Sequence, residues 1–240
     1  YKLSARAGYT RVETDVVKTA DGQFVIMHDD SINRTCRNAS DYSEIVGTVN
    51  VLGKTLAELR ANYVLASPIL RQRRKIPTYD EFLTTCRDYG LYPVIEIKYL
   101  GFTNAELEAL TTRAIEILGV NGFAFCSFGL SMLDYVRSVF PKVELYYIYG
   151  SGYVTSAAID HMVAMQPAVL YAYWGDYTQS LINEAHRKGV KVAGWTVPNN
   201  QFDNLLKMGF DEFATDTLAP PLDGQSILYS NYSGTTFAAY

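Results

Sequence analysis

Cysteine is scarce in this chain of 240 residues, which contains only Cys36, Cys86 and Cys126. The three are widely separated and odd in number, so the sequence suggests neither a disulfide framework nor the paired thiols of a zinc site. Long apolar runs are also missing, and no segment is apolar over the length that a membrane-spanning helix needs. These absences leave the compartment open and predict no transmembrane segment.

An excess of charge of either sign is missing as well. The chain carries 21 basic and 25 acidic residues, for a net charge of -4. The charge balance therefore gives no electrostatic footprint for nucleic acid or for an acidic membrane. One basic run, from Arg71 to Lys75, is interrupted by Gln72. A solvated loop is the favoured interpretation of this run, ahead of a binding patch.

The chain also begins at Tyr1, with neither an initiator methionine nor a signal peptide. We therefore expect it to be part of a longer protein, and a larger multidomain protein is one such case. Residues 1–7 are typical of the last turns of a helix, and Gly8 follows them at a position that favours a left-handed residue. We therefore expect this helix to begin before Tyr1.

Apolar strand patterns alternate with helix patterns along the chain. The expected strands begin at Arg11, Pro93, Gly122, Val143, Ala168, Val190 and Glu212. Such alternation predicts right-handed βαβ units and a parallel sheet. The length suits one α/β barrel of the (β/α)8 type, which needs an eighth strand, and we expect that first strand before Tyr1. An open doubly wound sheet is the alternative, but the glycine-rich phosphate loop that usually follows its first strand is missing.

The regular pattern stops at Pro220-Pro221, so we expect a barrel domain over residues 1–221. Residues 222–240 form a tail rich in serine, tyrosine and threonine. This tail is either a strand laid on the barrel or a connection to a further module.

The most informative stretch runs from Arg11 to Thr35. Two apolar runs flank Asp21-Gly22, a strong signal for a hairpin with a two-residue loop. Counting back from that loop places Asp15 opposite His28 and Glu13 opposite Asp30, on one face of the hairpin. Two carboxylates crossed by a histidine fit a metal or acid/base site. The alternative is that these polar residues only mark the wet side of a hairpin.

A second pair of charged residues, Glu96 and Lys98, ends the expected strand that starts at Pro93. Catalytic groups of a barrel gather at the carboxyl ends of its strands. Glu96 would therefore join Glu13 and Asp15 as a third oxygen ligand, a donor set that hard cations such as Mg²⁺ or Ca²⁺ prefer. The alternative for Glu96 and Lys98 is an ordinary surface ion pair.

The stretch resembles the signature of the glycerophosphodiester phosphodiesterases. The matching segments are Glu13-Thr14-Asp15, Thr19-Ala20-Asp21-Gly22, His28-Asp29 and Arg34-Thr35, followed later by Glu96-Ile97-Lys98, Trp195-Thr196-Val197 and residues 211–216. The resemblance implies that Glu13, Asp15 and Glu96 hold a metal and that His28 is one of two acid/base residues. It further implies that Lys98 faces the phosphate and that Trp195 lines the glycerol side of the pocket.

One family motif is absent from these 240 residues. It is a His-Arg-Gly on the first barrel strand, which in the family supplies the second histidine and a phosphate-binding arginine. His161 and His186 do not replace it, because both fall in helix patterns on the outside of the barrel. We therefore expect this stretch of chain, taken alone, to hold half of an acid/base pair and to be a poor catalyst.

The resemblance implies metal-dependent hydrolysis of glycerophosphodiesters, either small deacylated phospholipid head groups or a polyglycerol-phosphate wall polymer. One histidine would take a proton from the attacking hydroxyl and the other would protonate the leaving alkoxide. Two alternatives stay open. One is a non-catalytic module that binds glycerol phosphate or carbohydrate on the same barrel. The other is a phospholipase D-like enzyme that forms a cyclic phosphate.

Overall fold

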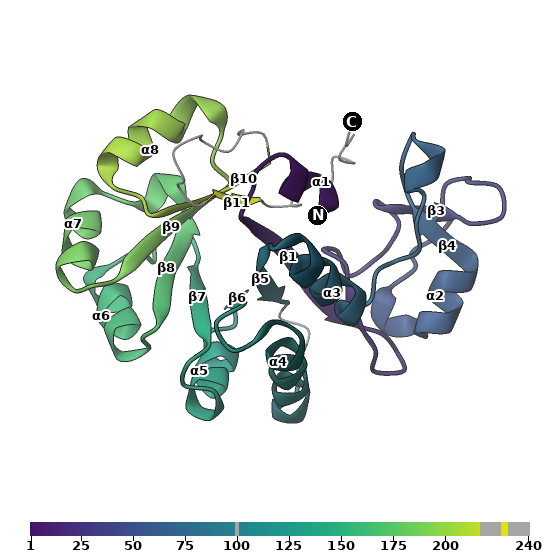
Figure 1. Ribbon diagram of the computed structural model, residues 1–240, viewed down its shortest axis with the longest axis horizontal. Coiled ribbons are helices and arrows are strands. Elements are labelled where there is room, and N and C mark those ends of the chain that lie inside the picture. Colours follow the sequence, from purple (N-terminus) through teal and green to yellow (C-terminus); the bar gives the residue numbers. More distant parts are fainter. Residues whose placement is uncertain (99–100, 217–226, 230–240) are drawn as a thin grey trace. The chain divides into compact units, whose positions relative to one another are not determined.

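The structure is a computed structural model that describes residues 1–98, 101–216 and 227–229 (Figure 1). The described part of the chain divides into two compact units. The first unit comprises residues 1–13 and 83–230, and the second comprises residues 14–82 together with 231–240, which lie outside the described residues. The expected boundary at residues 221/222 also lies outside the described residues.

The strands, in chain order, are β1 (Arg11–Lys18), β2 (Phe24–Ile26), β3 (Cys36–Asn38), β4 (Tyr63–Leu65), β5 (Tyr92–Ile97), β6 (Ala124–Ser127), β7 (Glu144–Tyr149), β8 (Ala168–Tyr173), β9 (Lys191–Trp195), β10 (Glu212–Thr215) and β11 (Ile227–Tyr229). The helices are α1 (Lys2–Arg6), α2 (Leu56–Asn62), α3 (Tyr79–Tyr89), α4 (Asn104–Leu118), α5 (Leu130–Val139), α6 (Ser156–Ala164), α7 (Gln179–Arg187) and α8 (Phe202–Met208). Four 3₁₀ turns complete the described elements: η1 (Val51–Gly53), η2 (Leu70–Gln72), η3 (Trp174–Asp176) and η4 (Asn199–Gln201).

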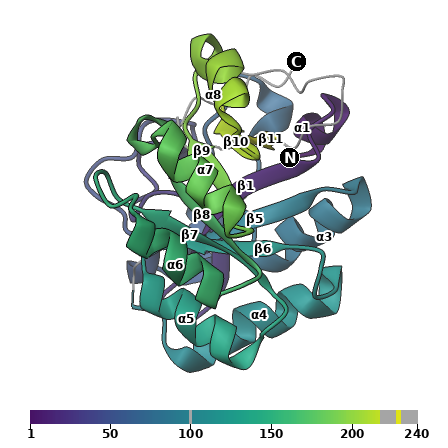
Figure 2. The same cartoon turned by 90° about the vertical axis from the view of Figure 1, so that its left-hand side faces the viewer.

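The sheet of the first unit is built from parallel strands, in the order β11-β10-β9-β8-β7-β6-β5-β1. β11 also pairs in parallel with β1, with Arg11 opposite Leu228 and Val12 opposite Tyr229, so the two ends of the sheet are joined. Helices α4 to α8 lie on the outer side of the strands (Figure 1, Figure 2). A joined parallel sheet of eight strands with helices outside is the (β/α)8 barrel that the sequence predicts.

The helices of this barrel begin where local chemistry favours a start. Thr103 opens α4 with a capping box, in which its hydroxyl accepts from the Glu106 amide and the Glu106 carboxylate accepts from the Thr103 amide at 2.7 Å. The carboxyl end of another barrel helix, α8, is at Gly209, which has a φ of 96°. A left-handed residue of this kind favours glycine, and it turns the chain toward β10.

The interior of the barrel is filled by side chains from alternate positions of β5 to β10. The buried set is Val94, Ala124, Cys126, Tyr146, Ile148, Val169, Tyr171, Ala193 and Ala214. Since strand residues two apart share a face, Glu96 follows Val94 on the inner side, and Glu212 precedes Ala214 there. The apolar layer therefore separates two polar regions, one at each end of the strands.

In the second unit, β1 and β2 form an antiparallel hairpin, and β3 and β4 form a separate antiparallel pair. The expected hairpin is present, but its register differs by one residue from the prediction. Val16 pairs with Ile26 and Lys18 with Phe24, which aligns Asp15 with Met27; the Met27 amide donates to the Asp15 carbonyl at 3.1 Å. The predicted pairing of Asp15 with His28 is therefore wrong, and so is that of Glu13 with Asp30, since β2 ends at Ile26.

The cause of the shift lies in the turn. The loop has three residues, Ala20 to Gly22, because the Thr19 amide donates to the Gln23 carbonyl at 2.9 Å and the Gly22 amide to the Thr19 carbonyl. The Thr19 hydroxyl donates to the Asp21 carboxylate at 2.5 Å and accepts from the Gln23 amide. Gly22, with a φ of 73°, takes the left-handed position of this turn. Side-chain hydrogen bonds from a threonine thus selected a loop one residue longer than the Asp-Gly pair suggests.

Candidate active site

Three buried carboxylates converge on β1 and β5. Glu13, Asp15 and Glu96 each offer an oxygen, and these atoms all lie within 4.8 Å of one another. The three residues are 5%, 4% and 8% exposed. Their positions follow from strand geometry, because Glu13 and Asp15 are two residues apart on one strand and therefore share a face. The sequence predicted this convergence correctly.

Lys98 lies directly beside the carboxylate cluster. Its Nζ is 3.0 Å from Glu96 Oε1, and the two side chains are only 17% and 11% exposed. The alternative of a surface ion pair is therefore wrong. One ammonium group does not balance three carboxylates, and like charges at this separation repel unless a further cation lies among them. Buried oxygen donors of this kind fit a hard divalent cation such as Mg²⁺ or Ca²⁺.

His28 belongs to a second polar group, within the second unit. Its Nδ1 lies 2.6 Å from Asp29 Oδ1, and Arg34 donates to both oxygens of the same carboxylate, at 2.6 and 2.8 Å. The Arg34 hydrogen bonds are the main reason that the pKa of Asp29 falls to about 2. An ionised Asp29 can only accept a hydrogen bond, so in neutral His28 the proton sits on Nδ1 and Nε2 is left as the basic atom.

The positions of Asp29 and Arg34 were visible in the sequence, but their roles were not. Sequence reasoning treated them as parts of a motif, whereas the geometry makes them the groups that orient His28. Arg34, five residues further on, binds both oxygens of the Asp29 carboxylate and so fixes its orientation toward His28.

Trp195 ends β9 at the carboxyl ends of the barrel strands. Its ring centroid lies 6.0 Å from that of Phe128, which follows β6, and 6.1 Å from that of Tyr173, which ends β8. Both contacts are close to edge-on, and Phe128 and Tyr173 are 49% and 39% exposed. Trp195 Nε1 is buried and has no hydrogen-bond acceptor among the residues that the structure describes. Sequence analysis singled out Trp195 and missed its two aromatic neighbours.

At the opposite end of the strands, Arg11 is the centre of a buried polar network. Arg11 Nη1 lies 3.2 Å from Glu144 Oε2 and 3.4 Å from Glu212 Oε2, and its guanidinium group is 4.2 Å from the centre of the Tyr92 ring. Tyr92 donates to Glu144 at 2.7 Å, and Tyr146 donates to Glu212 at 2.6 Å. Burial raises the pKa of Glu212, while Arg11 acts against that rise. Charge at the amino ends of barrel strands serves stability, since active sites form at the other face.

The remaining histidines lie on helices, as predicted. His161 is on α6, with Nδ1 2.8 Å from the Tyr149 hydroxyl and Nε2 3.3 Å from Asp134. His186 is on α7, with Nε2 3.0 Å from Asp211. Each is engaged by neighbours on the outer layer, away from the carboxylate cluster on the inner side.

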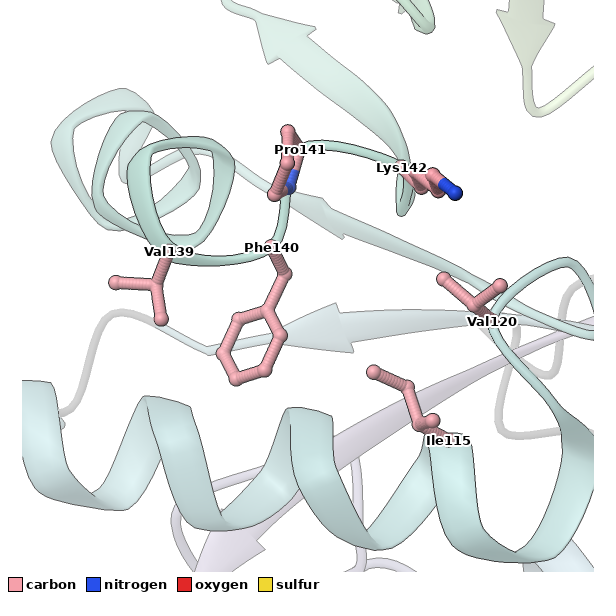
Figure 3. A pocket seen from close by; sticks show the side chains of 6 residues that line it. All are labelled: Ile115, Val120, Val139, Phe140, Pro141 and Lys142. Carbon is pink, nitrogen blue, oxygen red and sulfur yellow. The ribbon is translucent and has the colours of Figure 1, made fainter.

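The first unit also carries an apolar hollow of about 260 Å³, lined by Ile115, Val120, Val139, Phe140, Pro141 and Lys142 (Figure 3). Its lining comes from the end of α4, the end of α5 and the segments that lead into β6 and β7. It contains no acidic group and lies at the amino ends of these strands, so it is not the active site.

No helix within residues 1–98 and 101–216 is long and apolar enough to cross a membrane.

Comparison with known proteins gives these groups a context. The model of the glycerophosphoryl diester phosphodiesterase family matches residues 1–219. The chain belongs to this family. A glycerophosphodiester phosphodiesterase from Caldanaerobacter subterraneus subsp. tengcongensis is 24% identical over 90% of this chain and 86% of its own length. Glycerophosphodiester phosphodiesterase 1 from Homo sapiens is 30% identical over 53% of this chain and 36% of its own length.

Solved structures of the family have the same fold. A phosphodiesterase from Oleispira antarctica, in complex with the product sn-glycerol-3-phosphate, aligns with a TM-score of 0.72 at 21% identity, over 99% of this chain and 87% of the other. A glycerophosphodiester phosphodiesterase from Thermotoga maritima aligns with a TM-score of 0.64 at 20% identity, over 89% and 85%. Members of the family hydrolyse glycerophosphodiesters, and the chain is a phosphodiesterase-family enzyme.

Proposed function

We propose that this phosphodiesterase is metal-dependent and that Glu13, Asp15 and Glu96 hold its divalent cation, Mg²⁺ or Ca²⁺. The observation that carries the proposal is the burial of three carboxylates with oxygen atoms within 4.8 Å of one another. Three such charges exceed the single positive charge of Lys98 beside them, which favours binding of a further cation at neutral pH. A cation bound there supplies positive charge to the non-bridging oxygens of a phosphodiester.

Lys98 is the proposed phosphate-binding residue. It reaches the cluster through Glu96, at 3.0 Å, and an ammonium group with three donors can also contact a phosphate oxygen. Its role is to stabilise the charge that develops on the phosphate during bond cleavage. Trp195 is the proposed wall for the glycerol part of the substrate, and its buried indole N–H supports this role because a substrate oxygen would satisfy it.

His28 is the proposed acid/base residue. With Nδ1 donating to Asp29, its Nε2 can take a proton from an attacking hydroxyl or return one to a leaving alkoxide. The substrates that we propose are glycerophosphodiesters, either small deacylated phospholipid head groups or a polyglycerol-phosphate polymer. The name of the Oleispira antarctica complex, with sn-glycerol-3-phosphate as product, supports release of an alcohol and a glycerol phosphate.

Calorimetry on the purified chain tests the metal site. We expect Glu13→Gln and Glu96→Gln to lose most of the binding of Mg²⁺ and Ca²⁺, because each removes one charged oxygen donor from the cluster. Glu116→Gln is the matched control, since Glu116 is an exposed residue of α4. Unchanged affinity in both cluster variants would exclude this site.

Product analysis tests the reaction in the full encoded protein. A monoester product is expected from attack by water, whereas a cyclic phosphate would identify attack by a substrate hydroxyl, as in the phospholipase D-like alternative. Binding of a glycerophosphodiester without turnover, with the metal bound, would favour the non-catalytic module.

A further inference from the structure

The second unit presents an exposed basic loop, residues 68–75, that the proposed function does not use. The sequence is Pro-Ile-Leu-Arg-Gln-Arg-Arg-Lys, and it follows β4. Over the wider stretch from Leu59 to Tyr79 the chain has five basic residues and no acidic one. This local excess of positive charge contrasts with the near-balance of charge over the whole chain. From the sequence, a solvated loop was the favoured interpretation of the run from Arg71 to Lys75.

The charges of the basic loop are not neutralised. Arg71, Arg74 and Lys75 are exposed, and none of them lies within ion-pair distance of an acidic group among the described residues. The neighbouring Arg37 and Arg60, by contrast, pair with Glu44 and Glu81. The positive charge of the loop therefore faces solvent.

An apolar side chain stands among these charges. Leu70 is 74% exposed and lies in the 3₁₀ turn η2, next to Arg71. A single exposed leucine is ordinary on a protein surface. A leucine at the tip of a basic turn is the combination that lies at a membrane interface, where the apolar group enters the acyl boundary and the cations contact phosphates.

The loop is also held in shape. The Arg73 guanidinium group lies 3.3 Å from the centre of the Tyr42 ring, and its Nε donates to the Ser67 carbonyl at 3.2 Å. The Ser67 hydroxyl donates to the Gln72 side chain and accepts from the Ile69 amide. The Leu65 amide also donates a hydrogen bond to the Arg74 carbonyl at 2.7 Å. Together these contacts fix the turn that presents Leu70. A preformed turn loses little conformational entropy when it binds.

We propose that the basic loop docks this protein on an anionic lipid surface, with Leu70 entering the headgroup layer and Arg71, Arg74 and Lys75 contacting lipid phosphates. Charge complementarity favours an anionic partner. Leu70 favours a lipid surface over a nucleic acid or a polyphosphate chain, because neither of those offers an apolar layer to an aliphatic side chain. The proposal stands independently of the catalytic assignments.

Vesicle sedimentation of the full protein tests it. The vesicles are phosphatidylcholine alone or phosphatidylcholine mixed with phosphatidylglycerol, in the presence of a chelator that removes divalent cations. We expect binding to the anionic vesicles only, and weakening by about fivefold for each cation removed in Arg71→Gln and Arg74→Gln. Leu70→Ser should weaken binding several-fold with no change in net charge.

The matched control is the double variant Lys142→Gln, Lys207→Gln, which removes two exposed cations from the first unit. It should bind the anionic vesicles as the parent does, and circular dichroism should show that every variant is folded. Three results would overturn the proposal: no binding to anionic vesicles, an equal loss in the control, or unchanged binding of Leu70→Ser. The last result, with equal binding to heparin, would identify a general polyanion site instead.

Discussion

The acid/base chemistry of His28 depends on which of its two nitrogens carries the proton. Asp29, with its pKa lowered to about 2, is ionised throughout the working range of an enzyme and fixes the proton on Nδ1. The second nitrogen is then the same basic atom at every pH at which the ring is neutral. A single carboxylate therefore determines both the orientation and the tautomer of the proposed catalytic group.

Replacing His28 with Asn tests its role in the full encoded protein. The change preserves approximate size and polarity but removes titration, and positioned acid/base groups contribute about 10²- to 10⁴-fold in rate. We expect a fall in turnover of that order, with the free energy of unfolding within about 1 kcal/mol of the parent. Steady-state kinetics and urea denaturation measure the two effects. A protein that unfolds yet keeps its rate in the folded fraction would make His28 a structural residue.

Asp29→Asn provides the contrast at the neighbouring position. The amide can no longer enforce one tautomer, so we expect a smaller loss, of about 10- to 100-fold. Steady-state kinetics at neutral pH and urea denaturation measure the change. A loss of stability without a loss of turnover in the folded fraction would limit Asp29 to a structural role.

Residue chemistry explains both the success and the failure of sequence reasoning here. The spacing Glu13-x-Asp15 and the position of Glu96 near the end of an apolar strand were sufficient to predict the cluster. The partner of Asp15 was predicted wrongly, because the Thr19 hydroxyl bonds within the turn and adds a residue to the loop. Successive side chains of a strand point to opposite faces. An error of one residue in the register therefore assigns a side chain to the wrong face.

The strands of the barrel carry the site at one end and the Arg11 network at the other. Arg11, Glu144 and Glu212 are the first residues of β1, β7 and β10, at the amino ends of these strands. The network is buried, so it stabilises the fold only while its members neutralise one another's charges and complete one another's hydrogen bonds. Removing one member leaves the others without compensation.

Arg11→Met should therefore destabilise the fold by about 3 to 5 kcal/mol, the range for breaking a buried ion pair. The reason is that Glu212 would lose the cation at 3.4 Å from its carboxylate while remaining in the barrel interior, and Glu144 would keep only Lys191, at 3.7 Å. Urea denaturation at neutral pH measures the change. Arg113→Met, which breaks the exposed pair with Glu116, is the control and should stay within about 0.5 kcal/mol.

If Arg11→Met lowered the free energy of unfolding no more than Arg113→Met does, the Arg11 network would not be a source of stability. A second variant guards against a trivial packing effect. Arg11→Met combined with Glu144→Gln and Glu212→Gln removes the uncompensated charges, and it should recover part of the loss. Failure of the triple variant to recover any stability would assign the effect to the lost packing of Arg11 on Tyr92.

At the scale of the whole molecule, the seven barrel strands expected from the sequence are present, since alternating βα patterns report local structure directly. The eighth strand was expected before Tyr1, but among the described residues its position between β10 and β1 is held by β11. This strand comes from a tail beyond the residues matched by the family model, and three residues carry too little periodicity to be recognised. Its backbone pairs with β10 on one side and β1 on the other.

Leu228→Pro tests whether β11 closes the sheet. Proline removes a ladder donor, and within sheets it is confined to edge strands, first residues and bulges, so it should weaken the pairing of β11 with its neighbours. We expect faster hydrogen exchange of amides in β1 and β10 and a lower unfolding midpoint. Leu228→Ala keeps the amide and serves as the control. Equal protection in the two variants would show that β11 does not contribute to closure.

The pairing of β1 with β11 joins positions about two hundred residues apart along the chain. A ribosome adds roughly 5 to 20 residues per second, so β1 emerges roughly 10 to 40 seconds before the strand that completes it. Among the described residues, β11 is the strand that pairs with this edge of β1, so until β11 is made the edge lacks that partner, and an unpaired edge is a template for intermolecular pairing. The seam of this barrel thus makes its synthesis, more than its finished state, the period in which it is vulnerable to aggregation.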